Sequence, residues 1–248
     1  MLLHGVTMSA AAWTTVAPLL EDRFDLIVPT LAGHRGGEPT VVPASISILT
    51  DSVERLLDSR DLDTVHVAGN SMGGWIAIEL ARRGRAASVC ALSPAGLWAT
   101  GDPKDRSRNI LRCMRTLAVA TRRLTPPLLR FAAVRRLVMF AIAVHAERLT
   151  FEQAVVAFED LVGCSAAEDL LNTAEYLAPL ESLPCPITIA WSGNDRIFPP
   201  GSYLQTARER LPHARVIVLP GVGHVPMIDA PELCADTIIG SIGGEPMP

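Results

Sequence analysis

The sequence predicts an α/β protein with a mostly parallel sheet of about six strands, flanked by helices and interrupted by a helical insertion. The chain has 248 residues, of which 49% are apolar and 19% charged, so it can bury one large core. Short apolar runs alternate with helical patterns over residues 1–95 and again over 181–248, as is typical of parallel sheets. Residues 96–180 lack such runs and are rich in Ala, Leu, Val and Arg at helical spacing. We therefore expect a core formed by residues 1–95 and 181–248, with an insertion formed by residues 96–180.

Each element of this core has a local justification. Short runs of apolar or β-branched residues predict the strands, at residues 2–3, 24–28, 64–68, 88–92, 187–191 and 216–219. Apolar residues at helical spacing predict the helices, at residues 9–20, 45–60, 72–84, 202–210 and 231–239. Ser9 is a good capping residue, Gly84 a good helix terminator, and Pro231 suits a first helical turn. Residues 29–43 contain three glycines and three prolines and are expected to form a loop.

Composition excludes several classes of protein. The longest apolar run, Leu137–Val144, has eight residues, whereas a membrane-spanning helix needs about 20, so no transmembrane segment is expected. The N-terminus has no basic stretch and no cleavage site of the kind found in secretory signals, which makes a cytoplasmic location the default expectation. The five cysteines are scattered without CxxC spacing and are expected to be small packing residues. Neither a metal nor a cofactor is indicated, and no nucleic-acid partner is expected.

The pattern Gly-x-Ser-x-Gly at Gly69–Gly73 falls between a predicted strand and a predicted helix, the context in which it marks a nucleophilic serine. A nucleophile on so tight a turn needs glycine two residues before it and two after it, because a Cβ atom there would collide with neighbouring backbone. The start of the following helix adds partial positive charge where an oxyanion would form. Ser71 is therefore the predicted nucleophile.

A serine hydroxyl needs a base to take its proton, and one of six histidines must supply it. His224 lies in a glycine-rich loop directly after the last predicted strand, where a parallel sheet presents loops to its carboxyl edge. The remaining histidines lie in a strand, in the insertion, before a strand or beside the glycines of early loops: His66, His145, His213, His4 and His34. We expect His224 to be the base.

An acid must orient the imidazole, and Asp195 follows the penultimate strand at the same edge of the sheet. The chain order Ser71, Asp195, His224 is the order of the hydrolase fold in which nucleophile elbows occur. Asp229, five residues past the histidine, is the alternative acid, although its position suits the start of the last helix.

Two convergent N–H groups are needed to stabilise the oxyanion. The amide of Met72, directly after the nucleophile, is one candidate, and the amide of Val6, in the turn after the first strand, is the other. Trp13 and Trp75 are candidate pocket residues, but each lies on the apolar side of a predicted helix and is favoured as a core residue.

Taken together, these motifs resemble the α/β-hydrolase-fold serine hydrolases, in particular the small lidded esterases and C–C hydrolases. The resemblance covers nearly the whole chain and rests on the His4-Gly5 turn with Trp13 beyond it, the Gly33-His34 loop, the Gly69–Gly74 elbow, the Gly193–Asp195 loop, and His224 with Pro226 and Pro231-Glu232. It implies that residues 96–180 are a helical cap over the active site.

Three departures from the family pattern qualify what the resemblance implies. Members usually carry two strands before the His-Gly turn, so the sheet is expected to have about six strands instead of eight unless N-terminal residues are missing. Thr30 replaces the usual Asp ahead of the Gly-His loop, and Val225 stands where ring-cleaving C–C hydrolases usually have Trp. Haloalkane dehalogenases and epoxide hydrolases of this fold use an Asp nucleophile, so Ser71 disfavours both of those reactions.

The insertion gives the only indication of substrate and partners. Residues 128–144 are apolar nearly all round a helix, which favours a hydrophobic acyl or small apolar ester as substrate. Residues 101–150 carry a net charge of +8 and the remainder of the chain −12. This basic excess would suit an acidic carrier protein or anionic lipid, and it is also compatible with a solvated surface balanced by acids of the core.

The sequence therefore predicts a carboxylic ester hydrolase that works through an acyl-enzyme. Two alternatives stay open: a C–C bond hydrolase that acts on a diketone, and a receptor that binds a ligand on the same fold without turnover. The physiological substrate, the oligomeric state and the role of the arginine-rich insertion are not fixed by the sequence.

Overall fold

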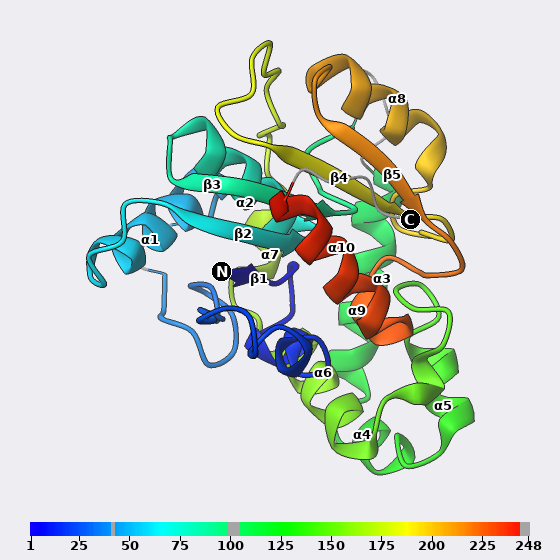
Figure 1. Ribbon diagram of the computed structural model, residues 1–248. Helices are drawn as coiled ribbons and strands as arrows, with labels where there is room; N and C mark the ends of the chain where they lie inside the picture. Colours follow the sequence, from blue (N-terminus) through cyan, green and yellow to red (C-terminus); the bar gives the residue numbers. More distant parts are fainter. Residues whose placement is uncertain (41–42, 99–104, 244–248) are drawn as a thin grey trace.

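A computed structural model describes residues 1–40, 43–98 and 105–243, and a parallel sheet lies at its centre (Figure 1). The five strands of the described residues are ordered β1-β2-β3-β4-β5, so strands that follow one another in sequence are also neighbours in space. Their bounds are Leu2–Leu3, Val65–Asn70, Ala86–Leu92, Ile187–Ser192 and Arg215–Leu219. Because all the strands are parallel, the loops that follow them emerge at one edge of the sheet.

Helices cover both faces of this sheet, and the alternation of side chains along each strand explains the two layers. The side chains of Val67 and Val89 belong to one apolar cluster, together with α1 (Ile46–Asp58), α2 (Met72–Arg82) and α8 (Pro200–Arg210). Their neighbours Ala68 and Cys90 belong to a second cluster, together with α10 (Pro231–Gly243) and two 3₁₀ helices, η1 (Ala10–Trp13) and η2 (Ala17–Leu19). The site is thus carried by a core that is buried on both sides.

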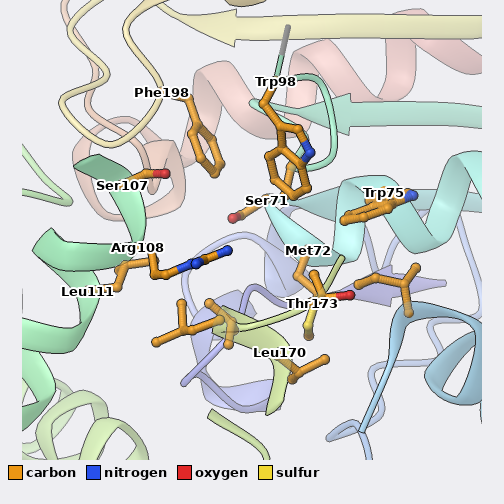
Figure 2. Close-up of a pocket in the computed structure, with 14 residues that line it drawn as sticks. Ser71, Met72, Trp75, Trp98, Ser107, Arg108, Leu111, Leu170, Thr173 and Phe198 are labelled. Carbon is orange, nitrogen blue, oxygen red and sulfur yellow. The ribbon is translucent and has the colours of Figure 1, made fainter. Parts of the chain in front are cut away.

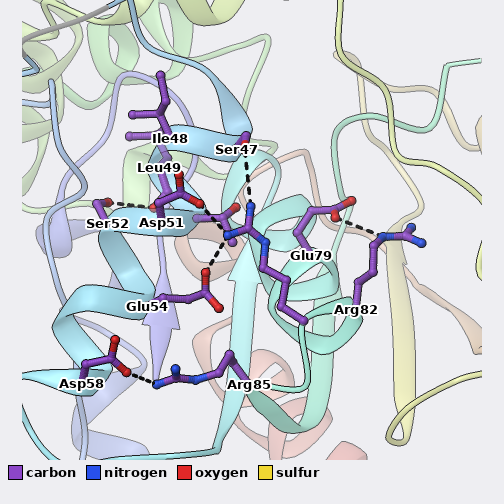
Figure 3. Close-up of polar contacts among 12 residues, drawn as sticks. Ser47, Ile48, Leu49, Asp51, Ser52, Glu54, Asp58, Glu79, Arg82 and Arg85 are labelled. Carbon is purple, nitrogen blue, oxygen red and sulfur yellow. Dashed lines mark hydrogen bonds and ion pairs between the residues drawn. The ribbon is translucent and has the colours of Figure 1, made fainter.

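Helix α1 lies against α2 through apolar residues and is also tied to it by ion pairs. Leu49, Val53 and Leu57 of α1 are buried in the first cluster. Around them, Arg83 contacts Asp51 and Glu54 at 2.5 Å each. Arg85 contacts Asp58 at 2.6 Å, as Figure 3 shows. Exposed pairs of this kind contribute at most about 1 kcal/mol each, so the buried residues provide most of the attachment.

The described residues between β3 and β4 form helices and no strand. These helices are α3 (Asp105–Ala120), α4 (Thr125–Leu128), α5 (Ala132–Val138), η3 (Ala146–Arg148), α6 (Phe151–Gly163) and α7 (Ala167–Leu171). Part of this helical segment has its own small core, which includes Leu129, Met139 and Phe158. In Figure 1, α4 and α5 lie at the end of the molecule farthest from the sheet, beyond α6.

Two sequence-based expectations about elements of the core were wrong, and each has a local cause. Residues 24–28 form no strand: Leu2 N–H donates to Ile27 O (2.8 Å), but this single bond does not make a ladder, and Pro29 has no N–H with which to extend one. The described sheet therefore has five strands instead of about six. The helix expected at 9–20 is the pair η1 and η2, because Pro18 has no N–H to continue an α-helix.

Residues 128–144 are likewise not one helix. Helix α4 ends at Leu128, the backbone of Phe131 is extended, and α5 begins at Ala132. The guanidinium group of Arg135 donates to Leu129 O (2.8 Å) and Arg130 O (3.1 Å), which satisfies carbonyl groups that the break leaves without helical partners.

Two further features concern the whole described chain. No described helix is long and apolar enough to cross a membrane. All five cysteines are free thiols; Cys90, Cys164 and Cys234 are buried, whereas Cys113 is exposed and Cys185 partly so.

The short helix α9 (Pro226–Asp229) follows the loop after β5 and was not expected from the sequence. It separates that loop from α10.

Candidate active site

Ser71 occupies a strained turn between β2 and α2. Its backbone has φ 54° and ψ −116°, a conformation that residues with a Cβ atom rarely adopt and that costs about 1–3 kcal/mol. Three backbone hydrogen bonds hold it: Ser71 N–H donates to Leu92 O (2.9 Å), and Ser71 O accepts from Trp75 (3.1 Å) and Ala95 (3.0 Å). The surroundings therefore fix the serine on a sharp corner at the start of a helix.

The glycines of the elbow are required by close backbone contacts. A Cβ atom on Gly69 would lie 2.2 Å from Gly73 O, and one on Gly73 would lie 2.2 Å from Leu3 O. Without a side chain at Gly73, the first turn of α2 can pack directly against the end of β1. This packing brings the loop that follows β1 next to the serine, and a Cβ atom on Gly5 would lie 3.3 Å from that of Ser71.

His224 and Asp195 form a buried pair at the same edge of the sheet. His224 Nδ1 lies 2.7 Å from Asp195 Oδ2, and both residues are buried. The other carboxylate oxygen, Oδ1, accepts from the amides of Ile197 (2.9 Å) and Phe198 (2.7 Å), so the carboxylate cannot rotate freely. This arrangement fixes the imidazole with Nδ1 toward the acid and leaves Nε2 as the nitrogen available to another group.

Asp229, the alternative acid, has different partners. Its carboxylate accepts from the amides of Gly223 (2.7 Å), Val144 (3.0 Å) and His145 (2.7 Å). These bonds join the loop that carries His224 to the helical segment. Of the two acids, only Asp195 has a hydrogen bond to the imidazole of His224 among those of the described residues.

The turn after β1 contains one of the two candidate oxyanion donors. Met8 N–H donates to Gly5 O (3.3 Å), which closes a turn with Val6 and Thr7 at its centre. Thr7, not the glycine, takes the left-handed backbone conformation, with φ 61°. The other candidate, the Met72 amide, belongs to the first residue of α2 and has no acceptor within its own helix.

His4 anchors this turn from behind. It is fully buried, its Nε2 accepts from Leu31 N–H (2.9 Å), and its Nδ1 therefore carries the proton and donates to Gly5 O (2.8 Å). Burial, together with the nearby His34, lowers the pKa of His4 to about 3. His4 is thus a neutral structural residue. The position of Thr30, a departure from the family pattern, is also structural, because its Oγ1 accepts from the amide of Ala10 (3.1 Å).

Sequence reasoning missed two residues that hold the site together. The side-chain amide of Asn70 donates to Leu92 O (3.1 Å) and to His224 O (2.9 Å), so it connects the elbow to the histidine loop. The ring of Phe198 meets that of His224 edge-on, with centroids 5.0 Å apart. The position of Asn70 inside the elbow was the signal for the first residue, whereas nothing in the sequence marked Phe198.

Ser71 borders two chambers. The smaller has a volume of about 70 Å³, and Figure 2 shows the serine side chain directed into it, among Phe198, Trp98 and Arg108. Trp75 lines this chamber although it is buried, whereas Trp13 is a core residue.

The larger chamber has a volume of about 280 Å³ and is lined by both Ser71 and His224. Val6 borders both chambers. Most of the larger chamber's wall is apolar, and most of its apolar side chains come from the helical segment, including Leu111, Met114, Val138, Met139, Ile142, Leu149 and Leu161. Within the described residues, no group of three or more His, Cys, Asp or Glu side chains is arranged to hold a metal ion.

Comparison with known proteins agrees with this geometry. The model of the alpha/beta hydrolase family matches residues 1–237. An epoxide hydrolase, EphH, of Mycobacterium tuberculosis is 35% identical over 204 residues, which are 80% of this chain and 95% of that protein. A pimeloyl-[acyl-carrier protein] methyl ester esterase of Aromatoleum aromaticum is 28% identical over 98% of both chains.

The fold is also found in solved structures. A thermophilic esterase from Thermogutta terrifontis superposes with a TM-score of 0.69 at 23% identity, covering 96% of this chain and 86% of that one. The named relatives are hydrolases, and the expectation of an α/β-hydrolase fold is confirmed. The chain belongs to the alpha/beta hydrolase family.

Proposed function

We propose that this chain is a serine hydrolase that cleaves carboxylic esters through an acyl-enzyme, with Ser71 as nucleophile, His224 as base and Asp195 as the orienting acid. The observation that carries the proposal is the 2.7 Å contact between His224 Nδ1 and Asp195 Oδ2, with His224 lining the same chamber as a serine on a strained elbow. A buried carboxylate on Nδ1 stabilises the imidazolium that forms when Nε2 takes the serine proton.

The reaction then follows from the groups present. The Ser71 oxygen attacks the ester carbonyl as its proton passes to His224 Nε2, and the carbonyl oxygen becomes an oxyanion. The amides of Met72 and Val6 donate to that oxyanion, assisted by the N-terminal end of α2. His224 gives its proton to the departing alkoxide. A water molecule, deprotonated by the same imidazole, then cleaves the acyl-enzyme and restores the Ser71 hydroxyl.

The two chambers support an apolar substrate. The larger one, about 280 Å³ with mainly apolar walls, would hold a hydrophobic acyl chain or a comparable apolar group. The smaller one, about 70 Å³, would hold the other side of the ester. In this proposal residues 96–180 act as a cap, because this segment provides most of the apolar side chains that line the larger chamber.

Epoxide hydrolysis is the second candidate, because a relative 35% identical to this chain is an epoxide hydrolase. The chemistry of Ser71 opposes it. An Asp nucleophile opens an epoxide to give an ester, and water can cleave an ester at its carbonyl carbon. A serine alkoxide would give an ether, which has no carbonyl for water to attack. Ester turnover without diol formation from a styrene oxide probe is therefore expected.

The proposal is tested with p-nitrophenyl butyrate and octanoate and with a fluorophosphonate label. We expect burst release of nitrophenol, labelling at Ser71, and a loss of kcat of about 10⁴ or more in Ser71→Ala with the fold intact. Ser52→Ala is the control, because Ser52 lies on helix α1, lines neither chamber, and donates its hydroxyl to Leu49 O within that helix.

Three outcomes would point elsewhere. Ester turnover retained in Ser71→Ala would reassign the nucleophile. Cleavage of a diketone in preference to the esters would favour the C–C hydrolase. Ligand-induced stabilisation without sustained nitrophenol release would favour a receptor.

A further inference from the structure

Large apolar side chains are exposed on one stretch of the helical segment. Among the described residues, eleven large hydrophobic side chains are exposed, and seven of these lie within residues 117–140. Leu137 and Leu124 are the most exposed, at 78% and 69%. The others are Leu117, Val119, Leu128, Phe131 and Phe140. Exposed apolar residues are unremarkable when scattered, but their concentration on the end of α3, α4 and α5 indicates a surface that is covered in use.

The same stretch carries only positive charge. Residues 117–140 contain five arginines and no acidic residue. Arg135 binds backbone carbonyls, whereas Arg122, Arg123, Arg130 and Arg136 are exposed. None of these four forms an ion pair with a carboxylate of the described residues. We call this set of exposed apolar and arginine residues within 117–140 the basic-apolar face. Arg136 also acts electrostatically on Glu147, but the face itself contains no acidic residue, so an anionic surface would complement it.

The basic-apolar face lies on the outside of the wall that encloses the larger chamber. Val138, Met139 and Ile142 line the chamber, while Leu137 and Phe140, from the same turn of chain, are exposed to solvent. On α3, Leu111 and Met114 line the chamber and Leu117 is exposed one turn further on. The segment that separates the chamber from solvent therefore carries apolar side chains on both sides.

We infer that the basic-apolar face docks onto an anionic lipid bilayer, with its leucines and phenylalanines inserted at the interface and its arginines on lipid phosphates. The role of this docking rests on the proposed function: an apolar ester dissolved in the bilayer would enter the larger chamber past α5 and the turn that follows it. An acidic carrier protein is less well matched. Binding by charge alone would not require leucines exposed by more than two thirds, whereas insertion into a lipid interface uses such side chains directly.

The first test measures binding of the full chain, as Ser71→Ala so that no lipid is hydrolysed, to sedimented vesicles. Vesicles of phosphatidylcholine alone are compared with vesicles of equal parts phosphatidylcholine and phosphatidylglycerol. Binding is expected to the anionic vesicles, and to weaken as salt is raised from about 0.01 M to about 1 M, where the Debye length shortens from about 30 Å to about 3 Å. Equal binding to neutral and anionic vesicles, or none to either, would overturn the inference.

Charge-neutralising variants distinguish binding through this face from binding driven by the net charge of the whole protein. The triple variant Arg122→Gln, Arg123→Gln, Arg130→Gln is expected to bind anionic vesicles about 100-fold more weakly, since each arginine near an anionic surface contributes about fivefold. The control removes the same charge elsewhere on the surface, at the exposed residues Arg23, Arg60 and Arg208. A loss in the control as large as in the triple variant would mean that net charge alone drives binding, and the face would have no specific role.

The apolar half has its own pair of variants. Leu124→Ser with Leu137→Ser is expected to weaken vesicle binding at least tenfold, while Leu19→Ser with Val218→Ser, at exposed sites of the core, leaves it unchanged. Self-association of the wild-type chain that these leucine changes abolish, without vesicle binding, would assign the face to a second copy. Capture of an acidic carrier protein without vesicle binding would assign it to that partner. Either result would overturn the lipid inference.

Turnover of soluble p-nitrophenyl butyrate keeps the two proposals apart. All these face variants, made with Ser71 intact, should hydrolyse it at the wild-type rate, which also shows that they fold. A chain that turns over the ester but ignores vesicles refutes the docking alone. A chain that binds vesicles but never releases nitrophenol refutes the proposed function alone.

Discussion

The replacement of Asp195 by Asn should inactivate the protein without unfolding it, and the contacts around the carboxylate explain why. Oδ1 accepts from two amides, those of Ile197 (2.9 Å) and Phe198 (2.7 Å), whereas Oδ2 faces His224 Nδ1 (2.7 Å). An asparagine keeps these amides satisfied only if its carbonyl oxygen occupies the Oδ1 position. Its NH₂ group then faces His224 Nδ1, which must lose its proton to accept the bond. The proton moves to Nε2, and the imidazole can no longer accept one from Ser71.

We expect kcat to fall by about 10⁴, equivalent to about 5.5 kcal/mol of transition-state stabilisation. The free energy of unfolding should change little, because the variant retains the amide bonds and a bond to the ring. Rates on p-nitrophenyl butyrate and urea unfolding measure these two quantities. Nitrogen-15 chemical shifts of the ring report the tautomer directly and should show Nδ1 without a proton.

Asp229→Asn provides the comparison. Both oxygens of Asp229 accept from backbone amides, of Val144 and His145 on one and of Val144 and Gly223 on the other. An NH₂ group in place of either oxygen would face a donor, at a cost of about 1–3 kcal/mol in stability. The imidazole tautomer should be unaffected and kcat should fall about tenfold or less. If instead Asp229→Asn were the more damaging to kcat and Asp195→Asn were mild, the acid would be Asp229 and the reasoning from the Oδ1 contacts would fail.

Two further predictions concern the turn after β1. Gly73→Ala should lower kcat at least 100-fold, because its Cβ atom would lie 2.2 Å from Leu3 O. Gly201→Ala, with open space around the added Cβ atom, should leave kcat unchanged. Equal rates for the two variants would contradict the close contact at Gly73. Burial lowers the pKa of His4 to about 3, so below about pH 6.5 the unfolded chain binds a proton that the folded chain does not. As the pH is lowered from about 6.5 to about 3, the free energy of unfolding should therefore decrease by about 1.4 kcal/mol per pH unit. His4→Gln should remove this contribution to the pH dependence of the free energy of unfolding, measured by urea unfolding at pH 7, 6 and 5. The contribution of His34, whose pKa is also lowered, should remain. An unchanged pH dependence would mean that His4 is protonated in the folded state.

Much of the core could be predicted because its signals are local. Ser45 marks the start of α1, where its hydroxyl accepts from Ile48 N–H (3.2 Å), and Gly84 follows α2 with φ 74°. The strands β2 to β4 are largely buried runs bounded by turn residues, and β5 is a β-branched run at the edge of the sheet. The order of strand ends along the chain also indicates which side chains meet, since parallel strands present their following loops at one edge.

Features that depend on packing between distant segments could not be predicted. Residues 24–28 are apolar enough for a strand, but only one backbone hydrogen bond, from Leu2 N–H to Ile27 O, joins them to β1 among the described residues. The apolar run at 128–144 suggests one helix, yet the side chain of Arg135 stabilises a break within it. Phe198 contacts His224 from a loop whose backbone is held by Asp195, which accepts from Phe198 N–H.

Asn70 shows how the strained elbow and the histidine loop depend on each other. Its single NH₂ group donates both to Leu92 O, beside the elbow, and to His224 O, in the loop after β5, although β3 and β4 lie between β2 and β5 in the sheet. The loop after β5 is in turn bonded through Asp229 to the helical segment, and Val225 N–H donates to Ile142 O (2.8 Å) in the wall of the larger chamber. These hydrogen bonds connect that wall to the loop of His224, and through Asn70 to the elbow, so a displacement of the wall should act on both. In a site where base and nucleophile must stay within hydrogen-bonding reach, contacts in the helical segment should affect kcat as well as substrate binding.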